Sequence, residues 1–410
     1  MRLLIPFRRR DFALLYAGQA TSMVGDGIFT VAITFQVLEV DDSAGALSIV
    51  LLAGSVGLVL CLLAAGVVSD RVERRRVLIF ADLVRLVAVG AMGVLSVAGA
   101  LQIWHVVALM LLYGAGEAFF QPAFGAILPA LVPTEELVQA NAVHGVIRPL
   151  ALRFAGPALG GALVAGLGPG QALLVDAATF GISAVCVLAL RARSHAGAVR
   201  EGALRELSAG WRYVRSQPWL WATLGSALLA VLCIVGPLQV LLPLVIRNEL
   251  GGDAGTFGAV LAVSGLGGVA AAVVMGSRGL GARPVTLMFV VWAVSTLPLC
   301  GYAFATATWQ LFPLAAIEGA GMTAGQVVWS TLMQTRVPAA LLGRVSSVDW
   351  LVSAGLAPLS FALTAPAAAA FGVSATLIVA GLVSSLGTLA FLPLALRQAP
   401  SAARSAVNAG

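Results

Sequence analysis

The chain has 410 residues, of which 60% are hydrophobic and only 10% are charged, and its mean hydropathy is +0.99. An ordinary soluble domain carries about 25% charged residues. This composition excludes a soluble globular domain, a disordered chain, a collagen-like chain and a small disulfide scaffold, and it indicates a polytopic membrane protein.

Twelve long apolar segments follow one another along the chain, and each approaches the ~20 residues that a membrane-spanning helix requires. The segments are too long and too continuous for the alternating ~10-residue strands of a membrane β-barrel. We therefore predict an all-α fold with twelve transmembrane helices, at roughly 12–38, 45–68, 77–97, 102–128, 140–166, 170–190, 217–246, 255–276, 285–305, 309–335, 345–369 and 373–396.

The 24 basic residues are all Arg, and their distribution predicts the orientation. If the N-terminus is cytoplasmic and the loops alternate, twenty Arg lie on the cytoplasmic side and only Arg247 lies on the other. Cytoplasmic loops carry the excess of positive residues. We expect a multi-pass protein of the inner (plasma) membrane with both termini in the cytoplasm, a retained first helix and no nucleic-acid partner, since the membrane accounts for the net charge of +6.

The longest cytoplasmic loop, 191–216, carries six Arg and an amphipathic stretch, so we expect it to lie on the membrane surface. It separates an N-terminal six-helix bundle, 1–190, from a C-terminal six-helix bundle, 217–396, which a cytoplasmic tail, 397–410, follows. The bundles echo each other: LVPTEELVQANAV at 131–143 precedes the span with Pro157, and RVPAALLGRVSSV at 336–348 precedes the span with Pro358. Two pseudo-symmetric halves are typical of a 6+6 transporter fold.

The string GVVSDRVERRR at 66–76 lies between the second and third spans. Its glycine permits close helix packing, its aspartate accepts hydrogen bonds, and its arginines bind anionic lipid or pair across helices. The string resembles the signature of the major facilitator superfamily, where this loop latches the two halves together; an ordinary positive-inside loop is the alternative. The resemblance implies a cytoplasmic latch made of Gly66, Asp70, Arg71, Arg74, Arg75 and Arg76. The corresponding string of the second half, GSRGLGARP at 276–284, has no Asp.

The string AGPALGG at 155–161 resembles the antiporter motif of the same superfamily. Proline removes a backbone donor and glycines permit tight packing, so this helix could act as a pivot. The candidate gating residues are Gly156, Pro157, Gly160 and Gly161. Leu152 and Val143 stand where the longer motif has glycines, and simple helix packing is the alternative reading.

Strings along nearly the whole chain, including FALLYAGQATSMVGDGIF at 12–29, FFQPAFGAILPALVP at 119–133 and GWRYVRSQPWL at 210–220, resemble the drug-exporter branch that contains macrolide-efflux and siderophore-exporter proteins. The resemblance implies the major facilitator fold and export, and it does not identify a substrate. It also implies that the first, fourth, seventh and tenth spans line a central cavity.

Charged residues inside the spans are the candidates for transport chemistry, because each costs ~2.5–3.5 kcal/mol on insertion scales. Asp26, Glu117 and Glu318 lie within the first, fourth and tenth spans, and we interpret them as sites for a proton or a cationic substrate, with packing as the alternative. Arg153 in the fifth span is the candidate partner of a cavity acid. The pair Asp82 and Arg85 is expected to be structural, and Asp176 and Asp349 interfacial or structural.

Polar and aromatic side chains in the expected cavity spans are candidate substrate contacts, with lipid-facing or core positions as the alternative. They are Phe35, Gln36, Tyr113, Phe120, Gln239, Gln326 and Trp329.

The sequence offers no sign of an enzyme, cofactor or metal site. The four Cys and three His have no metal-ligand spacing, and a phosphate loop is impossible without Lys. We predict a monomeric, proton-coupled exporter of a hydrophobic or amphiphilic small molecule that works by alternating access. The alternatives are an importer or facilitator of a metabolite with the same fold, and a non-transporting membrane scaffold or sensor.

Overall fold

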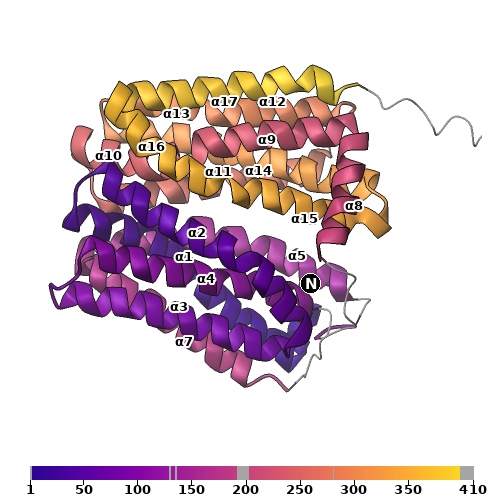
Figure 1. The fold of residues 1–410 in the computed structure, drawn as a ribbon, viewed down its shortest axis with the longest axis horizontal. Helices are drawn as coiled ribbons and strands as arrows, with labels where there is room; N and C mark the ends of the chain where they lie inside the picture. The colour runs from indigo at the N-terminus through magenta and orange to yellow at the C-terminus, as the bar shows by residue number, and fades with distance from the viewer. Residues whose placement is uncertain (1, 129–130, 134–135, 192–202, 280, 398–410) are drawn as a thin grey trace, which may run out of the picture.

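The computed structural model of the protein describes residues 2–128, 131–133, 136–191, 203–279 and 281–397. Within them, twelve helical spans are long and apolar enough to cross a membrane, which confirms the predicted fold class. The spans form two bundles, with the N-terminal bundle below and the C-terminal bundle above in Figure 1.

Six spans make the N-terminal bundle, and the fifth is built from three segments of different helical type. Its elements are η1 (Arg2–Arg8), α1 (Arg10–Val40), α2 (Ala44–Arg71), α3 (Arg74–Val97), α4 (Ile103–Ile127), α5 (Leu137–Pro149), η4 (Leu150–Ala155), α6 (Gly156–Leu167) and α7 (Pro169–Leu188). The segment η4 is a π-helix, directly before Pro157 at the start of α6. A proline lacks the backbone N–H that continues an α-helix, so the wider turn lies where the regular hydrogen-bond ladder is interrupted.

The C-terminal bundle also contains six spans, and more of these spans are divided into shorter helical segments. Its elements are α9 (Pro218–Gly236), η5 (Pro237–Leu241), α10 (Leu242–Leu244), η6 (Val245–Glu249), α11 (Ala254–Arg278), α12 (Pro284–Thr296), α13 (Pro298–Ala303), η7 (Thr308–Gln310), α14 (Leu311–Arg336), α15 (Ala339–Gly355), α16 (Ala357–Phe371) and α17 (Val373–Ala395). Pro237 and Pro243 interrupt the seventh span, where η5 and η6 are both π-helical. The amphipathic stretch of the predicted linker forms α8 (Ala203–Ser216), which packs against α15 and α9 of the C-terminal bundle.

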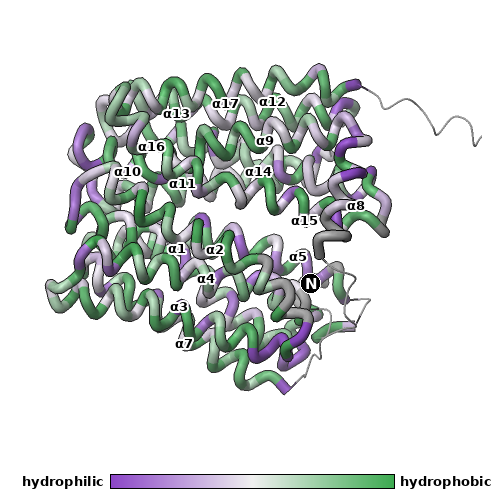
Figure 2. Tube along the Cα trace, viewed as in Figure 1, coloured by the Kyte–Doolittle hydropathy of each residue, from purple (hydrophilic) through white to green (hydrophobic). Residues whose placement is uncertain are grey.

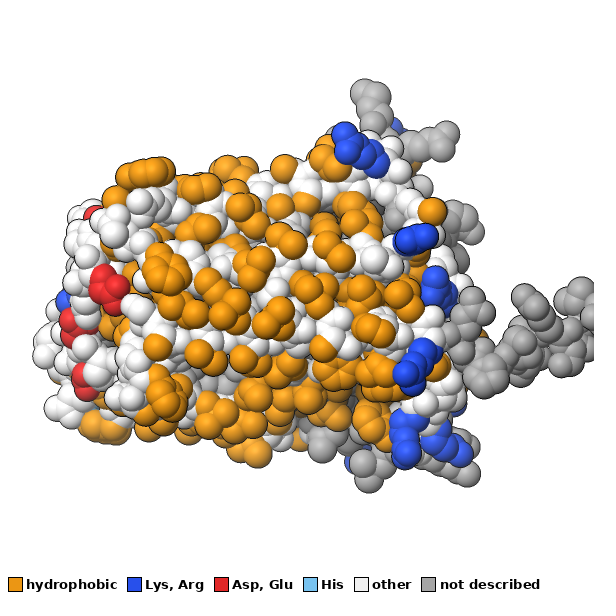
Figure 3. Space-filling view, turned by 90° about the horizontal axis from the view of Figure 1, so that it is seen from above, with side chains coloured by type: hydrophobic (Ala, Val, Ile, Leu, Met, Phe, Trp, Pro, Cys, Tyr) orange, Lys and Arg blue, Asp and Glu red, His pale blue; other side chains and the backbone are white. Residues whose placement is uncertain are grey.

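The two ends of the molecule differ in charge. Between them lies a broad belt of apolar side chains, with Arg gathered at one end and Asp and Glu at the other (Figures 2 and 3). The N-terminus and α8 lie at the arginine-rich end. This separation matches the charge asymmetry that the sequence predicts.

Within the described part of the chain, the cluster of buried apolar side chains that joins the bundles lies at the acidic end. One cluster there combines residues of both halves, including Val31 and Leu47 with Leu241, Phe257 and Phe361. At the arginine-rich end each bundle has a separate cluster, around Tyr16 and Phe120 in one half and around Trp219 and Phe289 in the other. The bundles therefore share an apolar core at the acidic end, and each has an apolar core of its own at the arginine-rich end.

Candidate functional site

A cavity of about 570 Å³ lies between the two bundles, in the middle of the membrane-spanning region. It receives side chains from α1, α3, α4, η4, α11, α14 and the broken seventh span. All four predicted coupling residues line it: Asp26, Glu117, Arg153 and Glu318. Of the predicted substrate contacts, Tyr113, Phe120 and Gln239 line it.

Asp26 faces the cavity from the middle of α1 and is held by an aromatic neighbour. The Tyr113 hydroxyl on α4 donates to its Oδ1 at 3.1 Å. The Tyr113 ring stacks on Phe29, one turn along α1, with the centroids 4.6 Å apart. Among the described residues, no arginine forms an ion pair with Asp26, and Arg85 pairs instead with Asp82 and Glu117.

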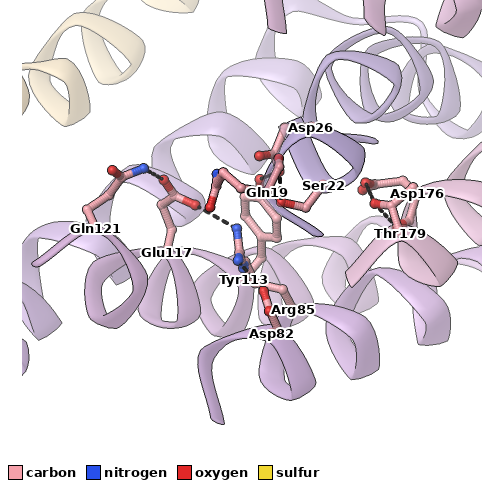
Figure 4. Close-up of polar contacts among 10 residues, drawn as sticks. All are labelled: Gln19, Ser22, Asp26, Asp82, Arg85, Tyr113, Glu117, Gln121, Asp176 and Thr179. Carbon is pink, nitrogen blue, oxygen red and sulfur yellow. Dashed lines mark hydrogen bonds and ion pairs between the residues drawn. The ribbon is translucent and has the colours of Figure 1, made fainter. Parts of the chain in front are cut away.

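Glu117 is held by Arg85, which comes from α3 (Figure 4). Arg85 Nη1 lies 3.2 Å from Glu117 Oε2, and Arg85 Nη2 lies 2.5 Å from Asp82 Oδ1. Gln121 donates to the second Glu117 oxygen at 2.9 Å. The Glu117 side chain is 26% exposed, whereas those of Arg85 and Asp82 are 1% and 0% exposed. Glu117 is thus the member of the network that meets the cavity.

The structure contains the expected ion pair of Arg85 with Asp82, and it gives Arg85 a second partner. The same guanidinium also lines the cavity and binds Glu117. Its Cζ lies 4.3 Å from the Phe120 ring centroid and 4.4 Å from that of Phe180, so two aromatic faces hold the cation in place. In the sequence, the position of Arg85 inside a span indicates that it has a special role. Its second partner, Glu117, lies on another helix, so the spacing of residues along the chain could not predict the pair.

Asp176 was expected to be interfacial or structural, and its surroundings are those of a structural residue. It is fully buried where α7 packs on α1, and Thr179 donates to its Oδ1 at 3.3 Å. The contact requires glycine at position 25, because a Cβ there would overlap Asp176 Oδ1 and Thr179 Oγ1. The Asp176 carboxyl lies between α7 and α1, and it is not among the residues that line the central cavity.

The C-terminal half contributes one acid to the cavity. Ser264 on α11 donates to Glu318 Oε2 on α14 at 2.6 Å, and Glu318 is close enough to Arg153 for an electrostatic interaction. Since Arg153 belongs to η4, this interaction crosses between the bundles. The expected pairing of Arg153 with a cavity acid is consistent with this arrangement.

Four predicted substrate contacts lie elsewhere. Phe35 packs against Phe257, and Gln36 accepts a hydrogen bond from Ser96 on α3. Trp329 is buried, and its Nε1 donates a hydrogen bond to Asp349 Oδ2 at 3.2 Å. Asp349 is therefore a structural partner of Trp329 within the C-terminal bundle. Gln326 is exposed, and it is not among the residues that line the cavity.

The predicted latch is described only in part. The side chains at Gly66 and Asp70 lie outside the described residues. Arg71 is exposed, Arg74 and Arg75 are partly buried, and Arg76 pairs with Glu73 at 3.1 Å. Arg75 donates to the carbonyls of Val187 and Leu188, at the end of α7. These contacts of Arg75 and Arg76 are all with residues of the N-terminal half.

The predicted gating residues lie where the bundles meet. Gly156 and Gly160 pack against Gly27 and Ile28 of α1, on one side of α6. Gly161 packs on the other side against α11, where a Cβ would lie 2.9 Å from the Ala254 carbonyl oxygen. The glycines therefore allow α6 to pack closely against α1 of its own bundle and against α11 of the C-terminal bundle.

Among the described residues, one ion pair crosses between the halves at the acidic end. Arg247 Nε of the seventh span lies 4.0 Å from Asp42 Oδ1, just before α2. This is the single Arg that the sequence assigns to the outer side. Among the described residues, no group of three or more His, Cys, Asp or Glu side chains has a geometry that could hold a metal ion.

Comparison with known proteins agrees with this architecture. The transmembrane secretion effector family matches residues 2–409. The chain belongs to this family. It is 31% identical to the multidrug efflux pump Tap of Mycolicibacterium fortuitum, over 94% of this chain and 96% of the pump. It is 26% identical to macrolide efflux protein A of Streptococcus pyogenes, over 59% of this chain and 60% of that protein.

A solved structure of similar fold is that of a bacterial homologue of the iron transporter ferroportin in the inward-facing state. The TM-score is 0.73 at 16% identity, with 95% of this chain and 99% of that chain covered. The family member described here is thus a multi-pass membrane protein of the major facilitator superfamily and a drug-efflux transporter, not an enzyme.

Proposed function

We propose that this transporter exports a hydrophobic or amphiphilic small molecule, preferably a cation, in exchange for protons. The observation that carries the proposal is the single central cavity with Asp26, Glu117 and Glu318 in its wall. Relatives named for multidrug and macrolide efflux support a drug-like substrate. Apolar residues such as Met23 and Ile234 line the same cavity and would accept its apolar part.

The proposed coupling is competition for the cavity acids. A proton on Asp26 neutralises a carboxyl that accepts a hydrogen bond from the Tyr113 hydroxyl. A substrate cation that takes this position displaces the proton, and a returning proton releases the substrate. One proton that crosses 100 mV supplies ~2.3 kcal/mol, before any pH gradient is counted.

We place the arginine-rich end in the cytoplasm, following the positive-inside rule. Both termini and α8 then lie in the cytoplasm of a plasma-membrane protein, and the cavity is open to the cytoplasm. Residues 1–190 and 217–396 would rock as two bodies around the cavity, with α6 as the pivot. One chain supplies both walls of the cavity, so we propose that a monomer is functional.

Substrate-induced proton movement in proteoliposomes tests the proposal. A panel of lipophilic cations, macrolides and siderophores is added with and without an imposed pH gradient. We expect proton counterflow with one compound class, and we expect Asp26→Asn and Glu117→Gln to abolish its pH dependence. Transport that keeps its pH dependence in both variants contradicts the coupling assignment. Flux of substrate into the cytoplasmic side would favour the importer alternative.

A further inference from the structure

A second pocket, of about 580 Å³, lies at the arginine-rich end of the C-terminal bundle. Its wall combines the starts of two spans with the ends of two others: Trp219 near the start of α9, Arg283 before α12, Arg336 at the end of α14 and Arg397 after α17. The pocket therefore lies at the depth where the apolar belt gives way to the polar surface. It is separate from the central cavity, with which it shares no lining residue.

Three arginines from three elements converge here without a balancing acid. No Asp or Glu lines the pocket. Within the described part of the chain, none of the three arginines forms an ion pair. Two arginines at the same end of the N-terminal bundle do form ion pairs, Arg9 with Glu136 and Arg76 with Glu73.

Backbone donors face the same region. The helices α9 and α12 both begin here, each with a proline at its first position, and neither has a side-chain cap. The first N–H groups of a helix lack intrahelical acceptors and favour an anion. The Thr286 hydroxyl also lines the pocket. Arg336 lies over the Trp219 ring, with Cζ 5.6 Å from the centroid, so one guanidinium is held in place before any ligand arrives.

We propose that this pocket binds the phosphate headgroup of an anionic phospholipid. Arginine forks match the geometry of phosphate oxygens, and basic pockets between transmembrane helices on the cytoplasmic side suit such headgroups. The depth of the pocket favours a lipid over a free phosphate ion, because the lipid's acyl chains would extend along the exposed apolar surface of the same helices.

Lipid binding to the purified full-length chain in detergent tests the proposal. Phosphatidylglycerol, phosphatidylcholine and inorganic phosphate are compared as ligands, by the thermal unfolding midpoint and by native mass spectrometry of bound lipid. We expect phosphatidylglycerol to raise the midpoint and to remain bound, since a ligand of the folded state stabilises it. Phosphatidylcholine and inorganic phosphate should have little effect.

The double variant Arg283→Gln, Arg336→Gln should bind phosphatidylglycerol at least tenfold more weakly, because it lacks two of the charged donors that face the headgroup. Arg278→Gln is the matched control, since Arg278 is exposed at the same end on α11 but does not line the pocket. If the double variant does not fold, the exposed single variant Arg283→Gln replaces it. Equal loss in Arg278→Gln, unchanged binding in the pocket variants, or equal stabilisation by inorganic phosphate overturns the proposal.

Discussion

Arg85 is the residue on which the polar network of the N-terminal half depends. Its charge is shared between the buried Asp82 and the cavity-facing Glu117, and two phenylalanine rings hold it. Removing one partner of a buried ion pair leaves an uncompensated charge, which costs more than the pair contributes. The position of Glu117 in the cavity therefore depends on a side chain of another helix.

We expect Arg85→Gln to destabilise the protein by roughly 3–5 kcal/mol, because Asp82 is left buried without its cation. Unfolding of the purified protein in detergent measures the loss. The double variant Arg85→Gln, Asp82→Asn removes both charges and should recover a large part of it. A single variant as stable as the wild type would show that Asp82 does not need the arginine.

At the surface, Arg9 and Glu136 form a two-pronged ion pair, with distances of 2.8 Å and 3.0 Å. The hydrogen bond from Arg9 lowers the pKa of the Glu136 carboxyl. A lowered pKa in the folded state means that the pair contributes stability above the ordinary carboxyl pKa, and that this contribution is lost as the pH falls through the folded value. Below that pH the protonated carboxyl no longer pairs with Arg9.

The thermal midpoint of the wild type should thus fall more on acidification than that of Glu136→Gln, which has no charge to lose. Unfolding scans on either side of the carboxyl pKa compare the two proteins. An identical loss in both would mean that other groups account for the acid sensitivity.

The sequence could identify the cavity acids but not the network around them. Asp26, Glu117 and Glu318 are visible because a carboxyl inside an apolar run is rare and costly. The second partner of Arg85, Glu117, could not be predicted because it lies on another helix. Their mutual positions depend on how α1, α3, α4 and α7 pack.

At the scale of elements, the fifth and eighth spans meet through glycines. A Cβ at Gly258 of α11 would lie 2.5 Å from the Pro157 carbonyl oxygen and 2.8 Å from Gly161 Cα, both of which are backbone atoms of α6. Backbone cannot move aside as a flexible side chain can. The close contact of α6 and α11 at the acidic end therefore needs glycine at this position.

We expect Gly258→Ala to force α6 and α11 apart and to weaken the closed acidic end by roughly 1–3 kcal/mol, the usual cost of overpacking. Distances between spin labels on the two bundles, at the acidic end, report the opening. Gly166→Ala in α6 is the matched control, because a Cβ there meets nothing within 4 Å. Equal distances in Gly258→Ala and the control would contradict the role of the glycine contact.

The sequence predicted the spans well because each span is a continuous apolar run. It did not predict the π-helical segments in the fifth and seventh spans, although Pro157, Pro237 and Pro243 mark the places. A proline shows where a helix loses a hydrogen bond, but packing decides whether the chain kinks, widens or breaks there.

At the scale of the whole molecule, closure of the acidic end combines the shared apolar cluster with one ion pair between the halves. Arg247 is 32% exposed and Asp42 is 44% exposed, so solvent weakens the attraction between them. The pair is therefore a small bias on the balance between open and closed states rather than the main cause of closure.

Arg247→Asp should shift this balance toward opening of the acidic end, by up to about 1 kcal/mol or about fivefold in population. The exchanged variant Arg247→Asp, Asp42→Arg restores opposite charges and should return the population toward that of the wild type. Cross-linking of engineered cysteine pairs across the acidic end measures both. Failure of the exchange to restore closure would show that the two side chains do not act as a pair.

The sequence by itself determined that this chain is a twelve-span membrane protein with its arginines concentrated on one side. These properties follow from the length of apolar runs and from the position of each charge along the chain. Only the tertiary structure decided that the acids of three spans share one cavity, that Arg85 holds Glu117, and that three arginines of the C-terminal half share a pocket. The reason is that the bundle packing brings side chains together from distant helices, and the separation along the chain does not specify the distance between them.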